Sequence, residues 1–454
     1  MLHPSNFKSM IDDIIVKPAY AAPVDQKERI HLLDSLRGIA ILGILMMNIP
    51  GFAIPQVLFG DLNLLHEAGT LNFTAWYFIE FFLEGSQRAI FSMLFGAGVL
   101  LFISRAEKRV SGLWPADYFL RRQLWLLLFG LFNSFILLWF WDILIDYACC
   151  GIIVFAFRRL APRALIIAGV VCLVLMTARE NYDYYKQKQM VAKGEAIAAI
   201  DTTVHKLTPR EKKMLNDMTS FRENSTPEKK REKYEEQLES GRGSYAEIYE
   251  DHSERRMYGL INYFFFGLWD VLSFMFFGMA FYKSGFLLGK APAKKYIILC
   301  LAALGLGLFI SYYRIQFVID NNYNNFQYTK KVPFQFYELS RTLRSIGIFA
   351  LIMVLYKSGL FKWFFSLMRP VGQMAFTNYL MQSFMVGFFF YGVGYGMYGK
   401  LQRYEMYYIV AATWALQIIY SHIWLRYFRF GPLEWCWRSL TYWKLQPLRK
   451  GREI

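Results

Sequence analysis

Long apolar segments alternate with short polar stretches along almost the whole chain. An apolar segment of roughly 17–25 residues can cross a bilayer as a helix, and this criterion predicts about ten spans. They lie at residues 36–54, 72–104, 123–141, 143–158, 164–178, 260–282, 296–313, 342–357, 372–396 and 405–425. The second is either one long span or two broken pieces, because Glu84 and Arg88 interrupt it. The predicted fold class is therefore all-α, a polytopic bundle of transmembrane helices.

Charged residues between the apolar segments predict the orientation of this bundle. Cytoplasmic loops of membrane proteins carry an excess of Lys and Arg. In this chain the excess lies at 105–122, 158–163, 283–295, 357–369 and after residue 426. The connection at 55–71 has no Lys or Arg and carries Asp61 and Glu67. Both termini are therefore predicted to be cytoplasmic.

One internal region, residues 179–258, is polar and rich in Lys, Glu, Arg and Tyr. Its pattern is helical, with breaks expected at Pro227 and at Gly241 and Gly243. It is predicted to lie outside the membrane, either as a solvated helical hairpin or flexible excursion, or as a cap over an external cavity or an assembly surface. The expected regions are a cytoplasmic extension (1–28), an N-terminal membrane half (29–178), the charged extracytoplasmic excursion (179–258), a C-terminal membrane half (259–428) and a basic aromatic tail (429–454).

Composition supports a membrane protein. The 454 residues are 55% hydrophobic and 19% aromatic, which is too apolar for an ordinary soluble protein. The net charge of +16 fits basic cytoplasmic loops better than nucleic-acid binding, because no basic patch lies on a soluble domain. The five cysteines form no CxxC pair or Cys/His cluster, so neither a disulfide framework nor a metal site is predicted. Ala19-Tyr20-Ala21 lacks the preceding apolar run that a signal peptide needs.

The first span carries polar residues along one face. Asp34 and Arg37 are three residues apart, and Asn48 follows eleven residues later, about three helical turns on. Polar groups on one face of a membrane helix are costly unless they face protein, water or a ligand. This face is therefore predicted to contribute to a binding site.

Charged residues within other spans have both a structural and a functional interpretation. Asp270, near the centre of its span, is either a functional acid or a structural partner of Arg37, Arg88 or Arg344. Glu84 and Arg88 are one turn apart, which favours a local ion pair at a helix break.

Two further pairs of polar residues are each one helical turn apart. Asp142 and Asp146 are either the polar ends of two helices or a paired acid site open to the outside. Asn378 and Gln382 are expected chiefly to hold helices together, and Gln417 is interpreted in the same way.

Histidine is scarce, which restricts the possible chemistry. His66 lies in the first external loop beside Glu67 and is a candidate base, although a single loop histidine usually has no such role. The chain contains no GxSxG elbow, phosphate loop or HExxH pattern, so a Ser-His-Asp hydrolase is not supported.

Five strings, in order along the chain, resemble the YeiB-like family of bacterial inner-membrane proteins, domain of unknown function number 418. They are RIHLLDSLRGIAILGILMMNI, EGSQRAIFSMLFGAG, FLRRQLWLLLFGLFNSFILLWFWDILIDYA, PVGQMAFTNYLMQS and LRYFRFGPLEWCWRSLTYWK. They cover nearly all of the membrane portion. The charged excursion is not explained by this resemblance, and the family has no settled biochemical role.

The string LDSLRG followed by an apolar run is more distantly similar to the first helix of transmembrane acyltransferases. This group includes bacterial sugar O-acyltransferases and heparan-alpha-glucosaminide N-acetyltransferase, which use a cytoplasmic acyl-CoA donor and an acceptor on the other side. In the sugar O-acyltransferases a histidine lies eleven residues after the motif arginine, where this chain has Asn48. Because an amide cannot act as a general base, that mechanism does not transfer directly. The heparan enzyme is the closer analogue, because it has an asparagine at that position and uses a histidine in the following luminal region. His66 is the positional counterpart of that histidine.

The resemblance implies movement of an acyl group from a cytoplasmic acyl-CoA donor to an extracytoplasmic sugar, lipid or envelope component. The residues expected to neutralise donor phosphates are Arg37, Arg121, Arg122 and Arg426. Asn48 would orient the carbonyl or stabilise an oxyanion. The candidate bases are His66, Asp142, Asp146 and Asp270. Further substrate-binding candidates are Asp34, Glu84, Arg88, Asn378 and Gln382.

These features lead to one expectation and two alternatives. We expect a multi-pass protein of the bacterial inner membrane with the bilayer as partner, acyl-CoA as co-substrate and no tightly bound cofactor or metal; a homodimer is compatible with the pattern. One alternative is a transporter or flippase, with Asp270, Glu84 and Arg88 lining a proton-coupled pathway. The other is an assembly protein that uses the 179–258 excursion.

Overall fold

A computed structural model describes residues 29–201, 206–265 and 267–450. The predicted extension 1–28, with its Ala19-Tyr20-Ala21 string, lies outside these residues. Every regular element within them is a helix, apart from one isolated bridge between Phe428 and Arg449. The predicted all-α fold class is therefore confirmed. The α-helices are α2 (His31–Ala53), α3 (Leu71–Phe78), α4 (Ser86–Arg109), α5 (Trp114–Phe135), α6 (Leu144–Ala156), α7 (Pro162–Ala198), α8 (Pro209–Asn224), α9 (Pro227–Arg242), α10 (Tyr245–Phe265), α11 (Gly267–Lys283), α12 (Ala293–Leu299), α13 (Gly305–Asp320), α14 (Asn325–Lys331), α15 (Tyr337–Ser358), α16 (Lys362–Gln373), α17 (Ala375–Phe390), α18 (Met406–Tyr427) and α19 (Pro432–Tyr442).

Six helical segments of the described residues are long and apolar enough to cross a membrane. They are His31–Ala53, Leu71–Arg109, Pro162–Ala198, Ala293–Asp320, Tyr337–Ser358 and Met406–Tyr427. The shorter apolar helix α6 and the helices α5, α11 and α17 pack into the same bundle. The total of about ten spans and the cytoplasmic location of both termini stay predictions.

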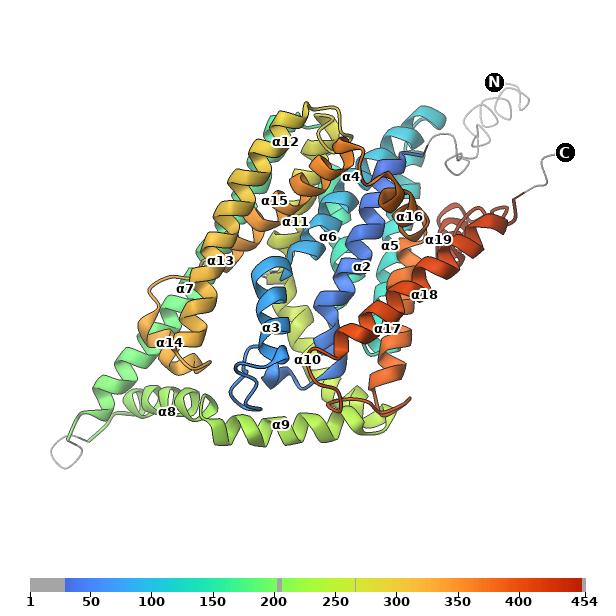
Figure 1. The fold of residues 1–454 in the computed structure, drawn as a ribbon. Helices are drawn as coiled ribbons and strands as arrows, with labels where there is room; N and C mark the ends of the chain where they lie inside the picture. Colours follow the sequence, from blue (N-terminus) through green and yellow to red (C-terminus); the bar gives the residue numbers. More distant parts are fainter. Residues whose placement is uncertain (1–28, 202–205, 266, 451–454) are drawn as a thin grey trace, which may run out of the picture.

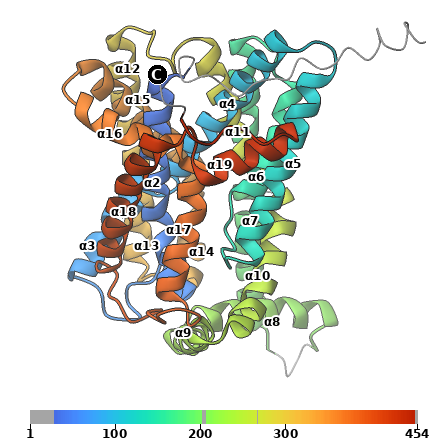
Figure 2. The ribbon, with the colours of Figure 1, turned by 90° about the vertical axis from the view of Figure 1, so that its right-hand side faces the viewer.

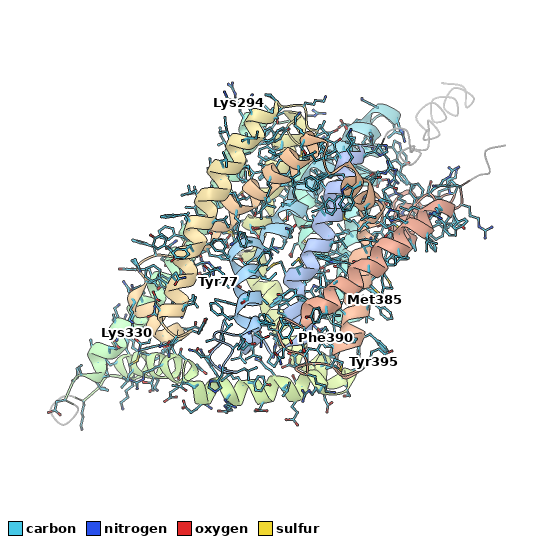
Figure 3. The ribbon with its side chains drawn as sticks, in the orientation of Figure 1. Tyr77, Lys294, Lys330, Met385, Phe390 and Tyr395 are labelled. Atoms are coloured by element: carbon cyan, nitrogen blue, oxygen red, sulfur yellow. The ribbon has the colours of Figure 1, made fainter. Side chains whose placement is uncertain are left out.

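The two ends of the bundle are closed by different elements (Figures 1 and 2). Helices α8 and α9 lie across one end, which we call the α9 end. Helices α16 and α19 lie at the opposite end, which we call the α19 end. Figure 3 marks the two ends with Lys294, near the α19 end, and Lys330, toward the α9 end. A ligand site can therefore be assigned to one end or the other.

The second apolar segment is broken, as the sequence allowed. Helix α3 passes into the π-helical turn η3 (Ile79–Leu83), and Gly85 then adopts a left-handed conformation with φ of 69° before α4 begins. Arg344 of α15 stabilises this break, because its guanidinium donates to the carbonyl oxygens of Glu80 at 2.9 Å, Phe81 at 3.0 Å and Glu84. Carbonyl groups that a broken helix leaves unpaired are thereby satisfied inside the bundle.

The break also revises the expected Glu84–Arg88 pair. Glu84 lies outside α4, so the one-turn spacing of a continuous helix does not apply to it. Glu84 accepts a hydrogen bond from the Tyr337 hydroxyl at 2.6 Å and lies 3.4 Å from the Arg344 guanidinium. Arg88 donates instead to Asp270 at 2.5 Å.

Asp270 joins three helices through buried charge. Its carboxylate on α11 accepts hydrogen bonds from Arg88 of α4 and from Arg341 of α15, the latter at 3.0 Å for one Nη atom. Arg341 also pairs with Glu338, and the exposed fractions of Arg341 and Asp270 are 1% and 3%. Of the partners expected for Asp270, Arg88 is correct, whereas the second arginine is Arg341 and not Arg344. The structural interpretation of Asp270 therefore accounts for its position.

The charged excursion, residues 179–258, is fixed to the bundle at the α9 end. Pro227 starts α9 and α9 ends before Gly243, as the sequence predicted, whereas Gly241 lies inside the helix. Lys230 is buried and pairs with Asp61, and the Gln237 side chain accepts from the Val57 backbone at 3.2 Å. Helix α9 thus lies over the 55–71 connection.

Amide side chains join α17 to its neighbours. Gln382 donates to the carbonyl oxygen of Ile41 in α2 at 3.1 Å and to Gln417 in α18 at 3.0 Å. Gln417 donates in turn to the Asn378 carbonyl oxygen at 2.8 Å. These contacts match the expected role of amides in helix–helix adhesion.

Replacing Asp270 with Asn should destabilise the bundle strongly. The variant leaves Arg88 and Arg341 buried beside a neutral group, and breaking a buried ion pair costs about 3–5 kcal/mol. Asp183→Asn is the matched control, because its pair with Arg179 is about half exposed and should contribute less than about 1 kcal/mol. Thermal unfolding in nanodiscs measures both, and equal effects of the two substitutions would contradict the assignment.

Candidate functional site

A cavity of about 240 Å³ opens among α2, α4, α5, α6, α17 and α19 toward the α19 end. Five arginines from four separate stretches of sequence line it, and we call it the arginine cavity. They are Arg29, Arg37, Arg105, Arg122 and Arg438. Two acids, Asp34 and Glu434, also line it. Its remaining wall is mostly apolar, so it offers concentrated positive charge in a largely dry setting.

The arginines are held in different ways. Arg37 donates to Asp34 at 3.2 Å, and Arg29 lies 3.8 Å from the same carboxylate. Arg122 lies over the Trp437 ring at 3.5 Å, and Arg438 lies over the Phe430 ring at 4.6 Å. Stacking occupies the face of a guanidinium and leaves its N–H edge for an oxyanion.

The arginine cavity has an excess of positive charge, because five arginines but only two acids line it. The pKa of Arg438 is lowered to about 10, chiefly by burial; the charges of Arg29 and Arg37 also lower it, whereas Tyr442 and Glu434 raise it. A bound anion would reverse this effect by favouring the charged guanidinium. The cavity is therefore suited to a ligand with phosphate or carboxylate groups.

Glu434 is a cavity residue that the sequence interpretation missed. Its carboxylate accepts from the backbone N–H groups of Phe376 at 2.8 Å and Thr377 at 3.0 Å, and from the Thr377 hydroxyl at 2.6 Å. It therefore caps the start of α17 from another helix. A side chain at Gly431 would collide with Glu434. This cap explains the FGPLEW string in the tail, which was the available signal.

A second cavity of about 350 Å³ lies on the α9 side of the first. We call it the carboxylate cavity, because Glu84, Asp142 and Asp146 line it. Asn48, Arg88, Arg256 and the aromatic residues Phe140, Trp141 and Tyr337 complete much of its wall. Asp34 and Arg37 therefore reach one cavity from α2, and Asn48 reaches the other from the same helix.

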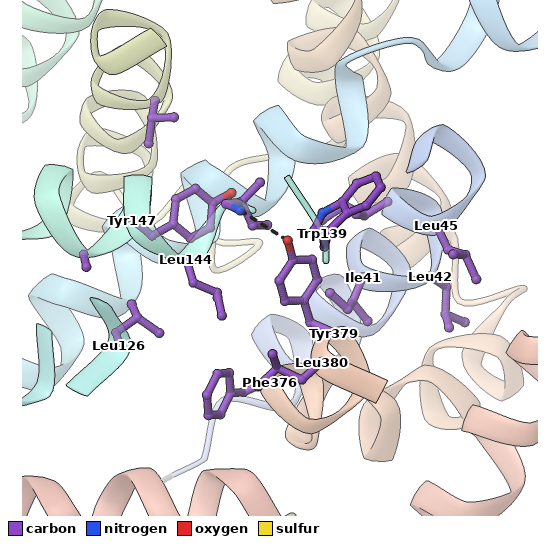
Figure 4. Close-up of a cluster of buried hydrophobic side chains, with 14 of the residues drawn as sticks. Ile41, Leu42, Leu45, Leu126, Trp139, Leu144, Tyr147, Phe376, Tyr379 and Leu380 are labelled. Atoms are coloured by element: carbon purple, nitrogen blue, oxygen red, sulfur yellow. Dashed lines mark hydrogen bonds between the residues drawn. The ribbon is translucent and has the colours of Figure 1, made fainter. Parts of the chain in front are cut away.

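The two cavities are separated by the first turn of α6. Leu144 and Tyr147 line the arginine cavity, whereas Ile143, Ile145 and Asp146 line the carboxylate cavity. Figure 4 shows Leu144 and Tyr147 facing Tyr379 and Phe376 of α17 across this region. Consecutive residues of one helical turn thus face opposite cavities, so the wall is about one helix thick.

The carboxylates of the second cavity differ in how they are bound. Asp142 accepts from the Asn133 side chain at 2.7 Å, from the backbone N–H groups of Leu144 and Ile145 at 2.7 and 3.0 Å, and from the Tyr379 hydroxyl at 3.3 Å. These hydrogen bonds hold the Asp142 carboxylate at the start of α6. Asp146 is buried one residue before Tyr147 and lines the cavity. Both aspartates therefore line the carboxylate cavity.

Other predicted site residues lie elsewhere. His66 is exposed in a turn and lines neither cavity, and Asp270 is enclosed by its arginines. Arg121 points to Asp117 at 2.7 Å. Asn378 and Gln382 bond to other helices, and Arg426 lines a separate groove described below. In the described parts of the chain, no group of His, Cys, Asp and Glu is placed to hold a metal.

Residues 281–444 match the family model described as a protein of unknown function, DUF418. The match lies in the C-terminal part of this chain. The chain is 29% identical over 445 residues to the uncharacterized protein YxaH of Bacillus subtilis, covering 95% of this chain and 99% of that one. It is 27% identical to the uncharacterized protein YeiB of Escherichia coli, covering 91% and 96%. The predicted YeiB-like resemblance is confirmed, and no solved structure matches the chain.

Within this matched region, Glu434 should make the free energy of unfolding depend on pH. Burial raises the pKa of Glu434 above its ordinary value of 4.5. The folded state then holds the proton more tightly than the unfolded state, so stability should fall as pH rises from the ordinary value through the raised one. Melting curves of wild type and Glu434→Gln across this range test it. The fall of melting temperature with rising pH should disappear in Glu434→Gln. It should persist in Glu228→Gln, which changes an exposed glutamate on α9.

Proposed function

We propose that this protein transfers an acyl group from a phosphate-bearing thioester, of the acyl-CoA type, to an acceptor on the other side of the membrane. One observation carries the proposal: an arginine-rich cavity and a carboxylate-lined cavity meet back to back at one turn of α6. A reaction between a polyanionic donor and an acceptor from opposite sides needs two such chambers with a thin partition. The expected setting is the inner membrane of a bacterium.

The arginine cavity would hold the donor. Arg37, Arg122 and Arg438 provide guanidinium groups that pair with phosphate through two N–H bonds each. The apolar wall, which includes Phe95, Phe102 and Leu126, suits the uncharged arm and acyl chain of a thioester. The donor would therefore lie with its phosphates toward the α19 end and its thioester toward Tyr147.

The carboxylate cavity would hold the acceptor. Aromatic rings beside carboxylates and an amide suit a polyhydroxylated or amino-bearing acceptor, such as a sugar or lipid headgroup. Asp146 would take the proton from the attacking hydroxyl or amine as its heteroatom bonds to the thioester carbon. The Asn48 amide would stabilise the oxyanion, and collapse would expel the thiolate, which takes up a proton. The reacting groups meet only if the acyl group passes Tyr147 and Tyr379, so the α6 turn must move during the cycle.

Transport is the second candidate function, because two cavities on either side of a thin wall are also the geometry of an alternating-access pathway. Glu84 and Arg88 line the carboxylate cavity, as this alternative expected. Asp270 is bound by two arginines, which makes it a poor proton carrier.

One assay separates transfer from transport. Proteoliposomes receive acetyl-CoA labelled in the acetyl group outside and a membrane-lipid and sugar extract inside. A labelled acceptor favours transfer, whereas flux of label without a product favours transport. Under the transfer mechanism, Asp146→Asn should lower product formation by about 10²-fold or more while donor binding persists, because a general base typically contributes that much. Full activity of Asp146→Asn would eliminate its assigned role.

Neighbouring arginines on α5 provide a matched test of donor binding. Arg122→Gln should weaken acetyl-CoA binding about tenfold, which corresponds to one lost charge-assisted contact. Arg121→Gln should leave binding unchanged, because Arg121 pairs with Asp117 and does not line the cavity. Equilibrium binding to the purified protein in nanodiscs measures both, and equal losses would argue for a general charge effect.

A further inference from the structure

A basic groove adjoins the arginine cavity at the α19 end. Its volume is about 260 Å³, and its lining residues come from the start of α2, from α16, from α18 and from the tail. The polar residues that line it are Arg29, His31, Arg369, Gln373, His422, Arg426 and Lys450. Among the described residues that line this groove none is acidic. We call it the basic groove.

The groove and the arginine cavity share part of their walls. Arg29 and Gln373 line both spaces. Glycine at positions 38 and 372 lets the backbones of α2 and α16 touch, because a Cβ atom at Gly372 would collide with the Asp34 carbonyl oxygen. This contact holds Asp34 and Gln373 close to each other. One elongated ligand can therefore occupy the cavity and reach the groove.

Arg369, which lines the groove, has an unused hydrogen-bond donor. The Nε atom of Arg369 is buried and has no hydrogen-bond partner among the described residues. A buried donor without a partner costs free energy, which a bound oxyanion would recover. Arg426 and Lys450 are exposed at the edge of the groove and can approach the same anion.

The number of cations favours a doubly charged group. A phosphate monoester carries a charge of about −1.5 to −2 at neutral pH, whereas the phosphodiester of a lipid headgroup carries one charge. Arg29, Arg369, Arg426 and Lys450 supply four cations with no acid beside them in the groove. Arg29 is partly balanced by Asp34, but the other three still exceed what a single charge would neutralise.

We propose that the basic groove binds a terminal phosphate monoester of the same donor whose thioester lies in the arginine cavity. The donor is then a nucleotide thioester that bears a phosphate remote from its diphosphate, such as the 3′-phosphate of coenzyme A. This assignment rests on the proposed function only for the identity of the donor. Binding alone tests it.

The direct test compares acetyl-CoA with acetyl-dephospho-CoA, which lacks only that phosphate. Equilibrium binding to the full chain in nanodiscs of neutral lipid should favour acetyl-CoA by at least about tenfold, as expected for new charge-assisted contacts. Equal affinities in the wild-type protein would overturn the proposal without any variant. A wild-type preference combined with no transfer would refute the proposed function and leave the groove assignment standing.

Variants locate the preference in the groove. Arg369→Gln and Arg426→Gln should weaken acetyl-CoA binding and leave acetyl-dephospho-CoA binding unchanged. The ratio of the two affinities should therefore approach one. Lys362→Gln is the matched control, because Lys362 is an exposed cation of α16 that does not line the groove. Equal weakening of both ligands in Arg369→Gln, or an altered ratio in Lys362→Gln, would contradict the assignment.

A lipid headgroup is the other source of phosphate at this end of the bundle. Repeating the comparison in nanodiscs with anionic phosphatidylglycerol distinguishes the two. An unchanged ratio supports a donor phosphate in the groove. Loss of the preference on adding anionic lipid, with Arg369→Gln lowering lipid binding, would assign the groove to lipid and overturn the proposal.

Discussion

Balancing charge inside an apolar bundle is the constraint on which this structure depends. Asp270 of α11 is held by Arg88 of α4 and Arg341 of α15, and the latter is also held by Glu338. A charge buried in such surroundings is tolerated only with a partner and satisfied hydrogen bonds. Three helices must therefore meet at one depth and in one register. Backbone groups are satisfied in a similar way, because Arg344 donates hydrogen bonds to the carbonyl groups of the broken α3–α4 segment.

The balance differs between this core and the arginine cavity. In the core, each arginine has a carboxylate or several carbonyl oxygens as partners. In the cavity, Arg122 and Arg438 rest on aromatic rings, and Asp34 serves both Arg29 and Arg37. Positive charge is thus compensated where it supports the fold and left in excess where a ligand can enter. This contrast is the physical basis for assigning function to the cavity and not to Asp270.

The short helix α6 contacts both the charge-balanced core and the arginine cavity. Asp142 caps its first turn, and Tyr147 at the end of that turn shares a hydrogen bond with the Ser92 hydroxyl at 2.9 Å. The turn is therefore well fixed in this structure, and it stands between the chambers. Helix α19 has a related role at the α19 end, because Glu434 caps α17 while Trp437 and Arg438 line the arginine cavity. Both elements are short, and both contact segments far away in the sequence, α6 through Tyr147 and Ser92 and α19 through Glu434 and Thr377.

The sequence by itself determined the helical fold class, the helices long and apolar enough to cross a membrane, and the breaks at Glu84 and Pro227, because hydrophobic period, length and helix-breaking residues act locally. It also singled out Asp34, Arg37, Asn48 and Asp146, since polar residues in apolar spans are costly wherever they lie. Only the tertiary structure decided which partners they have. Arg341 instead of Arg344 beside Asp270, the separation of His66 from both cavities, and Glu434 as a cap for α17 all depend on helix rotation and packing. Those are set by long-range contacts, about which residue spacing within one segment carries no information.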